Sequence, residues 1–457
     1  MSTSEDPEIV IIGCGVSGIA AAHRLVEAGY RHVRILEATG RSGGRIKTAA
    51  LGNTITEIGA AYIHGPSEKN PLFCLARDYG LLPPEALNPE NQAVDVDEDP
   101  PLVPNWFSSS GHQTYAESME PAEELFREIL DNASKFQNPQ NTSWKSLGHF
   151  MRTKVHSAGR WKDEDETTRQ LLLSAFSTML KFECCGSATH SMDDIDLAGF
   201  SMFESLRGVD CTLPRFVNTE GGLSPVTVEC ENGERIAADH VIVTVPLGYL
   251  KKHHSTLFHP PLPAHKLKSI KTLGFGTCDK IFVEFESPWW DADCDIIYLV
   301  WEDEATVSDQ VSDVSKSWIR KLVTFTVHKP SENHVLCGWI CGHEAEYMET
   351  LPEEKVRESI TKLVRTFTGN GTITPKRILC SRWFTDPWTY GSYCHPAIGC
   401  TAEDLKNMME PLPSQETLSQ PLQVLFAGEA THPYFYSTVH GAILTGWREA
   451  DRLISHY

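Results

Sequence analysis

Three glycines near the start of the chain have the spacing that binds a dinucleotide. Gly13, Gly15 and Gly18 form the pattern G-x-G-x-x-G. In this pattern the first glycine permits a tight turn, the second lets the backbone approach a pyrophosphate, and the third lets a helix pack closely on a strand. The free N–H groups at the start of that helix face the phosphates. The spacing therefore predicts a dinucleotide site.

An acidic residue and the surrounding elements complete the motif. Glu37 stands 19 residues after Gly18, where a carboxylate accepts hydrogen bonds from ribose hydroxyls. An acid there disfavours the 2′-phosphate of NADP but does not separate FAD from NAD. Residues 8–12 are a short apolar run, 17–28 have helical spacing, and 33–36 are a second apolar run. This order predicts β-α-β.

Further helices and strands are expected along the rest of the chain. Residues 81–205 alternate loops with amphipathic stretches and predict a mostly helical insertion. Within it, helices are expected at 122–133 and 167–182. The later expected elements are strands at 226–231, 235–245, 280–285 and 334–340 and helices at 353–367 and 441–454. Asn232-Gly233 is a turn pair suited to a hairpin between the first two of these strands.

The composition of the chain excludes several classes of function but does not identify one. The 457 residues include 61 Asp and Glu but only 40 Lys and Arg, a formal charge of −21. This charge disfavours nucleic acid and anionic membranes as partners and favours cationic ligands. No basic stretch with an apolar core opens the chain and no long apolar run follows, so neither secretion nor membrane spanning is expected. Thirteen scattered cysteines without paired C-x-x-C units predict reduced thiols and no metal.

Segments at both ends resemble the flavin amine oxidase family. Arg41-Ser42-Gly43-Gly44-Arg45 matches its R-x-G-G-R signature, residues 426–432 (FAGEATH) match its G-E segment, and 437–448 (STVHGAILTGWR) match the helix that follows. The resemblance implies FAD as the cofactor. It places Arg45 along the FAD phosphates and flavin, and Glu429 on the ribityl or phosphate side.

The likeness is strongest to the polyamine oxidases. Residues 59–65 (GAAYIHG) resemble an element of these enzymes that begins at the cofactor-binding Gly59, and the resemblance implies that His64 lines a substrate tunnel and takes part in the reaction. On frequency alone, a loop histidine more often only satisfies its own hydrogen bonds. Tyr62 stands where the family commonly has tryptophan, so the tunnel wall is expected to differ there.

A lysine is the leading catalytic candidate. Residues 274–285 (GFGTCDKIFVEF) resemble the strand that carries the family's flavin-site lysine, here Lys280. The resemblance implies that its ammonium holds a water against flavin N5 and assists the reaction with oxygen by electrostatics. Without the motif, a solvent-facing lysine is the commoner case.

Aromatic and acidic residues complete the expected site. Residues 382–393 resemble the segment that ends beside the flavin, with Trp383 in contact with the cofactor and Tyr393 as one wall for the amine. Thr438 replaces the opposing aromatic of the monoamine oxidases and is expected to contact both cofactor and substrate. Glu183 matches an acid that pairs with a distal ammonium of the substrate; a surface acid is the alternative.

The resemblance implies an α/β fold with two interwoven domains. A Rossmann-like FAD-binding domain would comprise residues 1–80, 206–260 and 391–457, and an α+β substrate-binding domain would comprise 81–205 and 261–390. The expected reaction is oxidation of a cationic N1-acetylated polyamine, with O2 reduced to hydrogen peroxide and release of an aldehyde and a shorter amine. A monomer is expected. A spermine oxidase and a catalytically impaired variant remain alternatives, whereas the related chromatin lysine demethylases need more domains than this chain can hold.

One departure from the family bears on activity. After Ser224 the family continues through a helix and a strand of roughly three dozen residues, and this chain goes directly to Pro225. In the family the strand contacts the adenine end of FAD, so its loss is expected to expose a sheet edge and to weaken FAD binding.

The chain ends at Ser455-His456-Tyr457 without a peroxisomal ending. Cytoplasm is expected, or peroxisomes if a targeting tail is missing.

Overall fold

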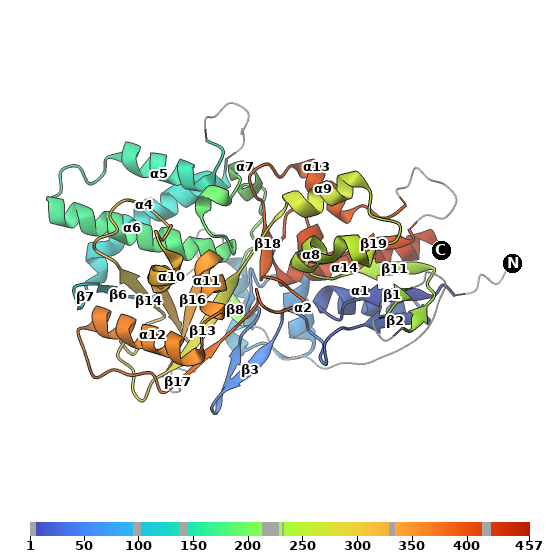
Figure 1. The fold of residues 1–457 in the computed structure, drawn as a ribbon, viewed down its shortest axis with the longest axis horizontal. Helices are drawn as coiled ribbons and strands as arrows, with labels where there is room; N and C mark the ends of the chain where they lie inside the picture. Colours follow the sequence, from blue (N-terminus) through green and yellow to red (C-terminus); the bar gives the residue numbers. More distant parts are fainter. Residues whose placement is uncertain are drawn as a thin grey trace.

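The computed structural model describes residues 6–94, 102–136, 144–212, 228–230, 233–328, 334–413 and 422–457. Two sheets organise it, one in each half of the molecule (Figure 1). The expected α/β fold is confirmed. None of the helices in the described ranges is long and apolar enough to cross a bilayer.

The first sheet is parallel and contains the glycine motif. Its strands, in the order β19-β11-β1-β2, are β19 (Val424–Phe426), β11 (His240–Val243), β1 (Ile9–Ile12) and β2 (Val33–Leu36). Helix α1 (Val16–Glu27) connects β1 to β2 and packs along the C-terminal helix α14 (Val439–His456). The contact is close, since a Cβ at Gly446 would lie 2.2 Å from the Ser17 carbonyl. The β-α-β unit is thus as expected.

The second sheet has seven strands in the order β17-β13-β16-β15-β14-β6-β7. They are β17 (Arg377–Cys380), β13 (Cys278–Glu284), β16 (Val335–Cys341), β15 (Thr324–Val327), β14 (Ile296–Val300), β6 (Pro104–Ser108) and β7 (His112–Thr114). All neighbours are antiparallel except β14 and β6. Because side chains alternate along a strand, Trp106 and Phe107 belong to separate cores on the two faces.

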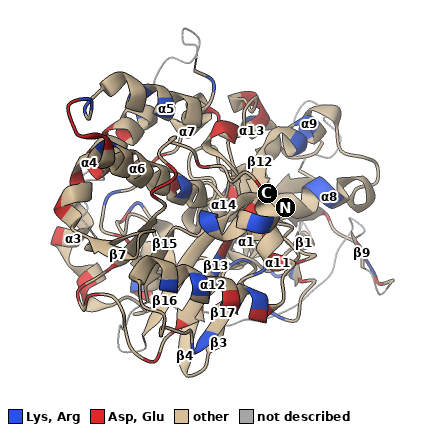
Figure 2. Ribbon diagram, turned by 60° about the vertical axis from the view of Figure 1, so that its left-hand side comes forward, with Lys and Arg blue, Asp and Glu red and all other residues tan. Residues whose placement is uncertain are grey.

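Helices cover both faces of this second sheet. One core is closed by α4 (Ala116–Ser134), α5 (Leu147–Ala158) and α6 (Glu166–Gly186), and the other by α11 (Gly342–Glu349) and α12 (Glu353–Thr368). The helical insertion predicted for residues 81–205 is therefore confirmed, although it also contributes β6 and β7. Figure 2 shows acidic residues over α4 and basic residues over α8 (Leu247–Leu257) and α9 (Ala264–Thr272).

The described part of the chain also contains short two-stranded ladders and shorter helices. The remaining ladders are β3 (Thr48–Leu51) with β4 (Thr54–Glu57), β5 (Tyr62–Ile63) with β8 (Cys211–Thr212), β9 (Val228–Glu229) with β10 (Arg235–Ile236), and β12 (Gly274–Gly276) with β18 (Tyr393–His395). The remaining α-helices in the described ranges are α2 (Pro71–Asp78), α3 (Pro89–Ala93), α7 (Leu197–Phe200), α10 (Val314–Ser317) and α13 (Ala402–Met409).

The prediction of a single strand at residues 235–245 is wrong. Residues 235–245 do not form a continuous strand, because β10 pairs with β9 in a hairpin whereas β11 joins the parallel sheet. The chain bends between them at Asp239, whose carboxylate accepts a 2.8 Å hydrogen bond from the Glu8 N–H. Asn232, the expected turn residue, lies outside the described residues.

Strand β2 forms one edge of the parallel sheet. In the described part of the chain it pairs only with β1, and all four of its residues are partly exposed, whereas β1 is mostly buried. The expected gap after Ser224 falls outside the described residues. All four strands of the sheet come from the segments that the sequence assigned to a cofactor domain.

Candidate functional site

The ends of the parallel strands form the first part of the candidate site. Parallel strands bring their carboxyl ends to one edge, where open α/β sheets bind ligands. Gly13 follows β1, Glu37 follows β2 and Gly428 lies just beyond β19. Gly13 has φ +109° and Gly428 has φ +119°, which glycine adopts without steric cost. The sequence pattern therefore meets its backbone requirement at this edge.

The glycine loop has the shape of a phosphate cradle. Helix α1 begins at Gly15 without a side-chain cap, and a Cβ at Gly15 would meet nothing within 4 Å. A Cβ at Gly18, in contrast, would lie 2.1 Å from the Gly13 carbonyl oxygen. The second glycine thus opens toward a ligand and the third permits close packing, as the motif requires.

Glu37 supports this loop from the side. One carboxylate oxygen accepts a 2.8 Å hydrogen bond from the Cys14 N–H, and the other accepts from the N–H and hydroxyl of Thr39 at 2.9 and 2.8 Å. A carboxylate has about four acceptor positions, so capacity for a ribose hydroxyl remains. The Gly43 N–H also donates to the Cys14 carbonyl at 2.8 Å, which joins the R-x-G-G-R segment to the glycine loop. These features fit a dinucleotide.

Arg45 and Glu429 connect the cofactor loops. Arg45 Nη1 donates to Glu429 Oε1 at 2.9 Å and to the Ser392 carbonyl at 2.7 Å. The other oxygen of Glu429 accepts from the backbone N–H groups of Ser437 at 2.9 Å and Cys394 at 3.3 Å. Glu429 is 5% exposed. This carboxylate therefore joins three segments that contain Arg45, Cys394 and residues 429–437.

Lys280 lies on β13 at the centre of the site. Its Nζ donates to the Gly59 carbonyl at 2.6 Å and to the Glu57 carbonyl at 2.9 Å, and it lies 4.8 Å from the centre of the Trp339 ring. Among the described residues these are its two hydrogen bonds, and since an ammonium has three N–H groups, one donor remains for a water. Burial lowers the pKa of Lys280. The lysine is thus a buried, positioned donor and not a surface residue.

Gly59 must be glycine for this arrangement. A Cβ there would lie 2.0 Å from the Arg45 carbonyl oxygen and 2.8 Å from the Lys47 nitrogen. The loop that accepts the Lys280 hydrogen bond is therefore packed directly against the segment that carries Arg45.

Trp383 is held by Asp279, the residue before Lys280, and Tyr393 is held by the end of helix α6. The Trp383 N–H donates to Asp279 Oδ1 at 3.3 Å, and Asp279 is buried beside Lys280 in the chain. Tyr393 begins β18 and its hydroxyl donates to the Cys185 carbonyl. Burial raises the pKa of Tyr393 well above its usual value, so the phenol is neutral. Trp383 is 6% exposed and Tyr393 is partly buried.

Thr438 has a structural role that sequence comparison did not indicate. Its hydroxyl accepts from the Gly441 N–H at 3.0 Å, as the N-cap of α14, and donates to the Phe435 carbonyl at 2.7 Å. Serine, threonine and aspartate are preferred at this position because they satisfy a free helix N–H. The hydroxyl is therefore already engaged, and contact with a ligand would come through the methyl group.

His64 faces a partner that was not predicted. Its Nδ1 lies 2.5 Å from Asp210 Oδ2, and Tyr62 lies beside it with ring centres 6.2 Å apart. Burial works to lower the pKa of His64, but the hydrogen bond and charge of Asp210 outweigh it, so the pKa is raised. His64 also acts electrostatically on His440 in the first turn of α14, which places it near Thr438.

We expect Asp210→Asn to lower the pKa of His64 toward about 6.5. Because the folded-state pKa is raised, the ion pair stabilises the protein fully below the unfolded pKa and this contribution disappears as pH rises through the folded value. NMR titration of the His64 imidazole measures the shift. Glu346→Gln, which removes the comparable partner of His343, is the control and leaves His64 unchanged. An identical His64 pKa in both variants would contradict the pairing.

Glu183 lies apart from the other candidates. It is partly buried on α6, two residues before Cys185, and it acts electrostatically on Tyr298. Burial raises the pKa of Glu183 to about 7. A carboxylate in such surroundings gains most from an added cation. The structure thus brings together Lys280, Arg45, Gly59, Trp383, Tyr393, Glu429 and Thr438, with His64 and Tyr62 at the start of α14 and Glu183 on a separate helix.

Sequence reasoning missed Asp210, Asp279 and Ser392. Asp279 was within the quoted lysine segment, and its position next to Lys280 was an available signal. Ser392 binds both the N–H and the carbonyl of Cys278 through its hydroxyl. Asp210 had no motif that could have identified it. In the part of the chain that the structure describes, no group of three or more metal-ligating side chains could hold an ion.

Comparisons with known proteins agree with this geometry. The family model "Flavin containing amine oxidoreductase" matches residues 16–203 and 209–454. The chain is 42% identical to the human peroxisomal N(1)-acetyl-spermine/spermidine oxidase and 41% identical to its bovine counterpart; each match covers 98% of this chain and 95% of the relative. A solved structure of putrescine oxidase bound to putrescine superposes with a TM-score of 0.68 at 18% identity, covering 98% of this chain and 99% of the other.

The human alignment is longer than the part of this chain that it covers. It runs over 488 positions, whereas 98% of this 457-residue chain is about 448 residues. About 40 aligned positions, the difference between these numbers, therefore have no counterpart in this chain. This shortfall is similar in size to the segment expected after Ser224.

Proposed function

The chain belongs to the flavin containing amine oxidoreductase family, and from this premise we propose that it oxidises N1-acetylated polyamines such as N1-acetylspermine and N1-acetylspermidine. Its cofactor is FAD, and the enzyme is an FAD-dependent oxidoreductase. The names of the two mammalian relatives support the substrate class. A single chain carries every residue of the proposed site, so we propose a monomer.

The cofactor and the residues have separate tasks. When bound, FAD accepts a hydride from the carbon beside the substrate nitrogen and passes the electrons to O2, which yields hydrogen peroxide. Arg45, Glu429 and the glycine loop would hold the cofactor. Tyr393 and Trp383 would exclude water and orient an uncharged amine, whose lone pair assists loss of the hydride. Water then converts the imine product to an aldehyde and a shorter amine.

The observation that carries the proposal is the position of Lys280. It is 6% exposed, its ammonium is held by two backbone carbonyls, and one N–H remains for a water. A fixed positive charge at this point stabilises the negative charge that develops as oxygen is reduced. The Gly59 loop that accepts one of these hydrogen bonds packs against the segment that carries Arg45, which supports a place for the lysine beside the cofactor.

The substrate class is tested by comparing acetylated with free polyamines. Peroxide release from N1-acetylspermine, N1-acetylspermidine and spermine gives kcat/KM for each. We expect the acetylated substrates to be preferred by at least about tenfold, equivalent to about 1.4 kcal/mol in transition-state binding. A preference for spermine would identify a spermine oxidase instead.

Glu183→Gln is expected to raise KM about tenfold and to remove a pH dependence. Since the pKa of Glu183 is about 7, the side chain ionises as pH rises from 6 to 8, and only the ionised form attracts an ammonium. KM of the parent enzyme should therefore fall over this range, and that of the variant should change less. Glu166→Gln, at the exposed start of the same helix, is the control. Parallel profiles for all three proteins would exclude Glu183 from substrate binding.

A second candidate is a family member that binds FAD poorly. The exposed edge of β2 and the shortfall of about 40 aligned positions support it, because in the family the absent strand contacts the adenine end. Flavin absorbance of the purified protein, before and after incubation with FAD, distinguishes the two. One flavin per chain and normal turnover would exclude the second candidate, whereas no flavin after incubation would exclude the first.

Cellular location is a separate question. The relatives are named peroxisomal, and we propose cytoplasm or peroxisomes for this chain. Imaging of an N-terminally tagged chain with a peroxisomal marker decides between them.

A further inference from the structure

Four buried cysteines from three elements gather beside the site. Cys184 and Cys185 end helix α6, Cys278 begins β13, and Cys341 ends β16. All belong to one core, with exposures from 0% to 6%. No step of the proposed reaction uses them. We refer to these residues as the thiol cluster.

Two members of the thiol cluster face each other across adjacent strands. Cys278 and Cys341 are register partners in the antiparallel β13–β16 ladder. The next pair is hydrogen-bonded, since the Gly342 N–H donates to the Thr277 carbonyl at 2.8 Å. Pairs alternate along such a ladder, so Cys278 and Cys341 form a non-hydrogen-bonded pair with Cα atoms about 4.5 Å apart. Disulfides need about 4.4–6.8 Å, so these two can bond without backbone movement.

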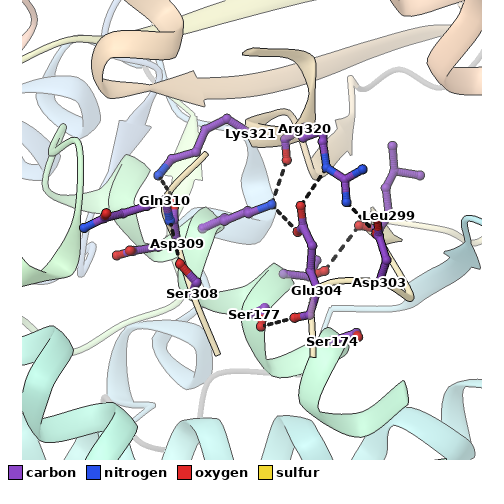
Figure 3. Close-up of polar contacts among 12 residues, drawn as sticks. Ser174, Ser177, Leu299, Asp303, Glu304, Ser308, Asp309, Gln310, Arg320 and Lys321 are labelled. Carbon is purple, nitrogen blue, oxygen red and sulfur yellow. Dashed lines mark hydrogen bonds and ion pairs between the residues drawn. The ribbon is translucent and has the colours of Figure 1, made fainter. Parts of the chain in front are cut away.

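A buried cation lies behind the cluster. Lys321 is 1% exposed, and its Nζ donates to the carbonyls of Asp309 at 2.5 Å and His190 at 2.9 Å and lies 3.7 Å from Cys184 Sγ. Figure 3 shows Lys321 beside Asp309. The Asp309 carboxylate is itself occupied by hydrogen bonds from Ser191 and the Met192 N–H. The three N–H groups of the ammonium are thus directed at two carbonyls and at the Cys184 thiol, and its charge acts on the rest of the cluster through space.

The neighbouring thiols and the Lys321 charge together favour the thiolate form of Cys341. Burial works to raise the pKa of Cys341, but hydrogen bonds from the Cys184 and Cys185 thiols and the charge of Lys321 outweigh it, so the pKa is lowered. The thiolate is the form of cysteine that attacks peroxide. Cys341 is therefore the nucleophile of the cluster.

The cluster is close to the point where peroxide would form. Residues two apart on a strand point to the same face and are about 7 Å apart. Cys278 is two residues before Lys280, and Cys341 is two residues after Trp339, which faces Lys280. Cys278, Cys341 and Lys280 therefore share one face of the β13–β16 ladder. Peroxide made at Lys280 would therefore form about 7 Å along the ladder from these thiols.

We propose that the thiol cluster is a site of oxidation by the enzyme's own hydrogen peroxide, which converts Cys278 and Cys341 to a disulfide. The Cys341 thiolate attacks one peroxide oxygen, the O–O bond breaks, and the hydroxide released takes a proton to become water. The resulting sulfenic acid is attacked by the Cys278 sulfur, which loses its proton, and a second water leaves. One peroxide is reduced and two thiols are oxidised. This inference rests on the proposed function for its source of peroxide.

The test uses turnover in the presence of catalase. Catalase removes hydrogen peroxide from the solution but is too large to enter the enzyme. Oxidation of the thiol cluster by peroxide formed inside the enzyme therefore persists, whereas oxidation by peroxide from the solution stops. After turnover of N1-acetylspermine, we expect the denatured enzyme to contain two fewer free thiols than its 13 cysteines provide. Peptide mass spectrometry should locate a Cys278–Cys341 disulfide while the more exposed Cys74, Cys230 and Cys400 remain reduced.

Three cysteine variants and a sample without substrate distinguish the possible outcomes of this test. Cys278→Ala and Cys341→Ala should each abolish the disulfide, whereas Cys294→Ala, at a buried cysteine outside the cluster, should leave it intact. A thiol count unchanged by turnover, or a disulfide from Cys341 to Cys184 or Cys185, would overturn the assignment. Peroxide release from N1-acetylspermine without catalase and hydrogen peroxide added without substrate separate the failures. No peroxide release means that the proposed function has failed, whereas normal release with an unchanged thiol count overturns oxidation by the enzyme's own peroxide.

Discussion

Replacing Lys280 with Met is expected to slow the reaction of the reduced enzyme with oxygen by about 10²–10³-fold, the usual loss when a positioned electrostatic group is removed. The ammonium is the only part of the side chain lost, because Met retains the length and apolar stem. Stopped-flow mixing of substrate-reduced enzyme with oxygenated buffer measures this step directly, since flavin absorbance returns as oxygen reacts. The preceding reduction by substrate should change much less.

The loss of two hydrogen bonds in Lys280→Met is a competing explanation for slower reoxidation. A matched control variant separates this effect from the loss of the charge. Met at position 280 leaves the carbonyls of Glu57 and Gly59 without their buried donor, at a cost of about 1–3 kcal/mol each. Lys266 is also buried, and its Nζ donates to the carbonyls of Asn407 at 2.5 Å and Met408 at 3.2 Å above the Phe426 ring. Lys266→Met therefore reproduces the loss of stability outside the site. Equal reoxidation rates in both variants would remove Lys280 from the mechanism.

The β-α-β unit and helix α12 were predictable because the residues that determine each of them are close together in the sequence. The β-α-β unit is defined by glycines that no larger residue can replace at φ +109° or within 2.1 Å of a carbonyl. Helix α12 begins and ends within a residue of the expectation because its apolar positions follow one helical face. Motif resemblance added the residues of the site, including Lys280, whose burial no propensity indicates.

The contacts between distant segments were not predictable from a single sequence. Asp210 meets His64 across 146 positions, and no pattern joins residues so far apart. Thr438 was assigned to the substrate wall, yet its hydroxyl caps α14, because the same residue type suits both tasks. The strand expected at 235–245 is divided because residues on its two sides belong to different sheets, a fact that only the tertiary structure contains.

Glu429 is the residue where these distant contacts converge, and its removal is expected to have the largest effect on stability. The side chain is 7% exposed and that of Arg45 is 22% exposed. Glu429→Ala leaves two backbone N–H groups without an acceptor and the largely buried Arg45 guanidinium without its ion pair, with the Ser392 carbonyl still accepting from it. Removal of one partner of a buried ion pair costs about 3–5 kcal/mol, and partial exposure of Arg45 moves the expectation to the lower end of that range. Denaturant unfolding of the variant and parent measures the difference.

The same change should release FAD, and this second effect distinguishes Glu429 from other paired acids. The carboxylate holds Ser437, just before the start of α14, and Cys394 on β18 relative to Arg45, so its loss frees three of the segments that surround the cofactor. Glu284→Ala is the control, since Glu284 pairs with Lys376 and Arg377, which are more exposed, and exposed pairs contribute only about 0–1 kcal/mol. A Glu429 variant as stable as the Glu284 variant, with full flavin absorbance, would show that the three segments are held together by packing and not by this carboxylate.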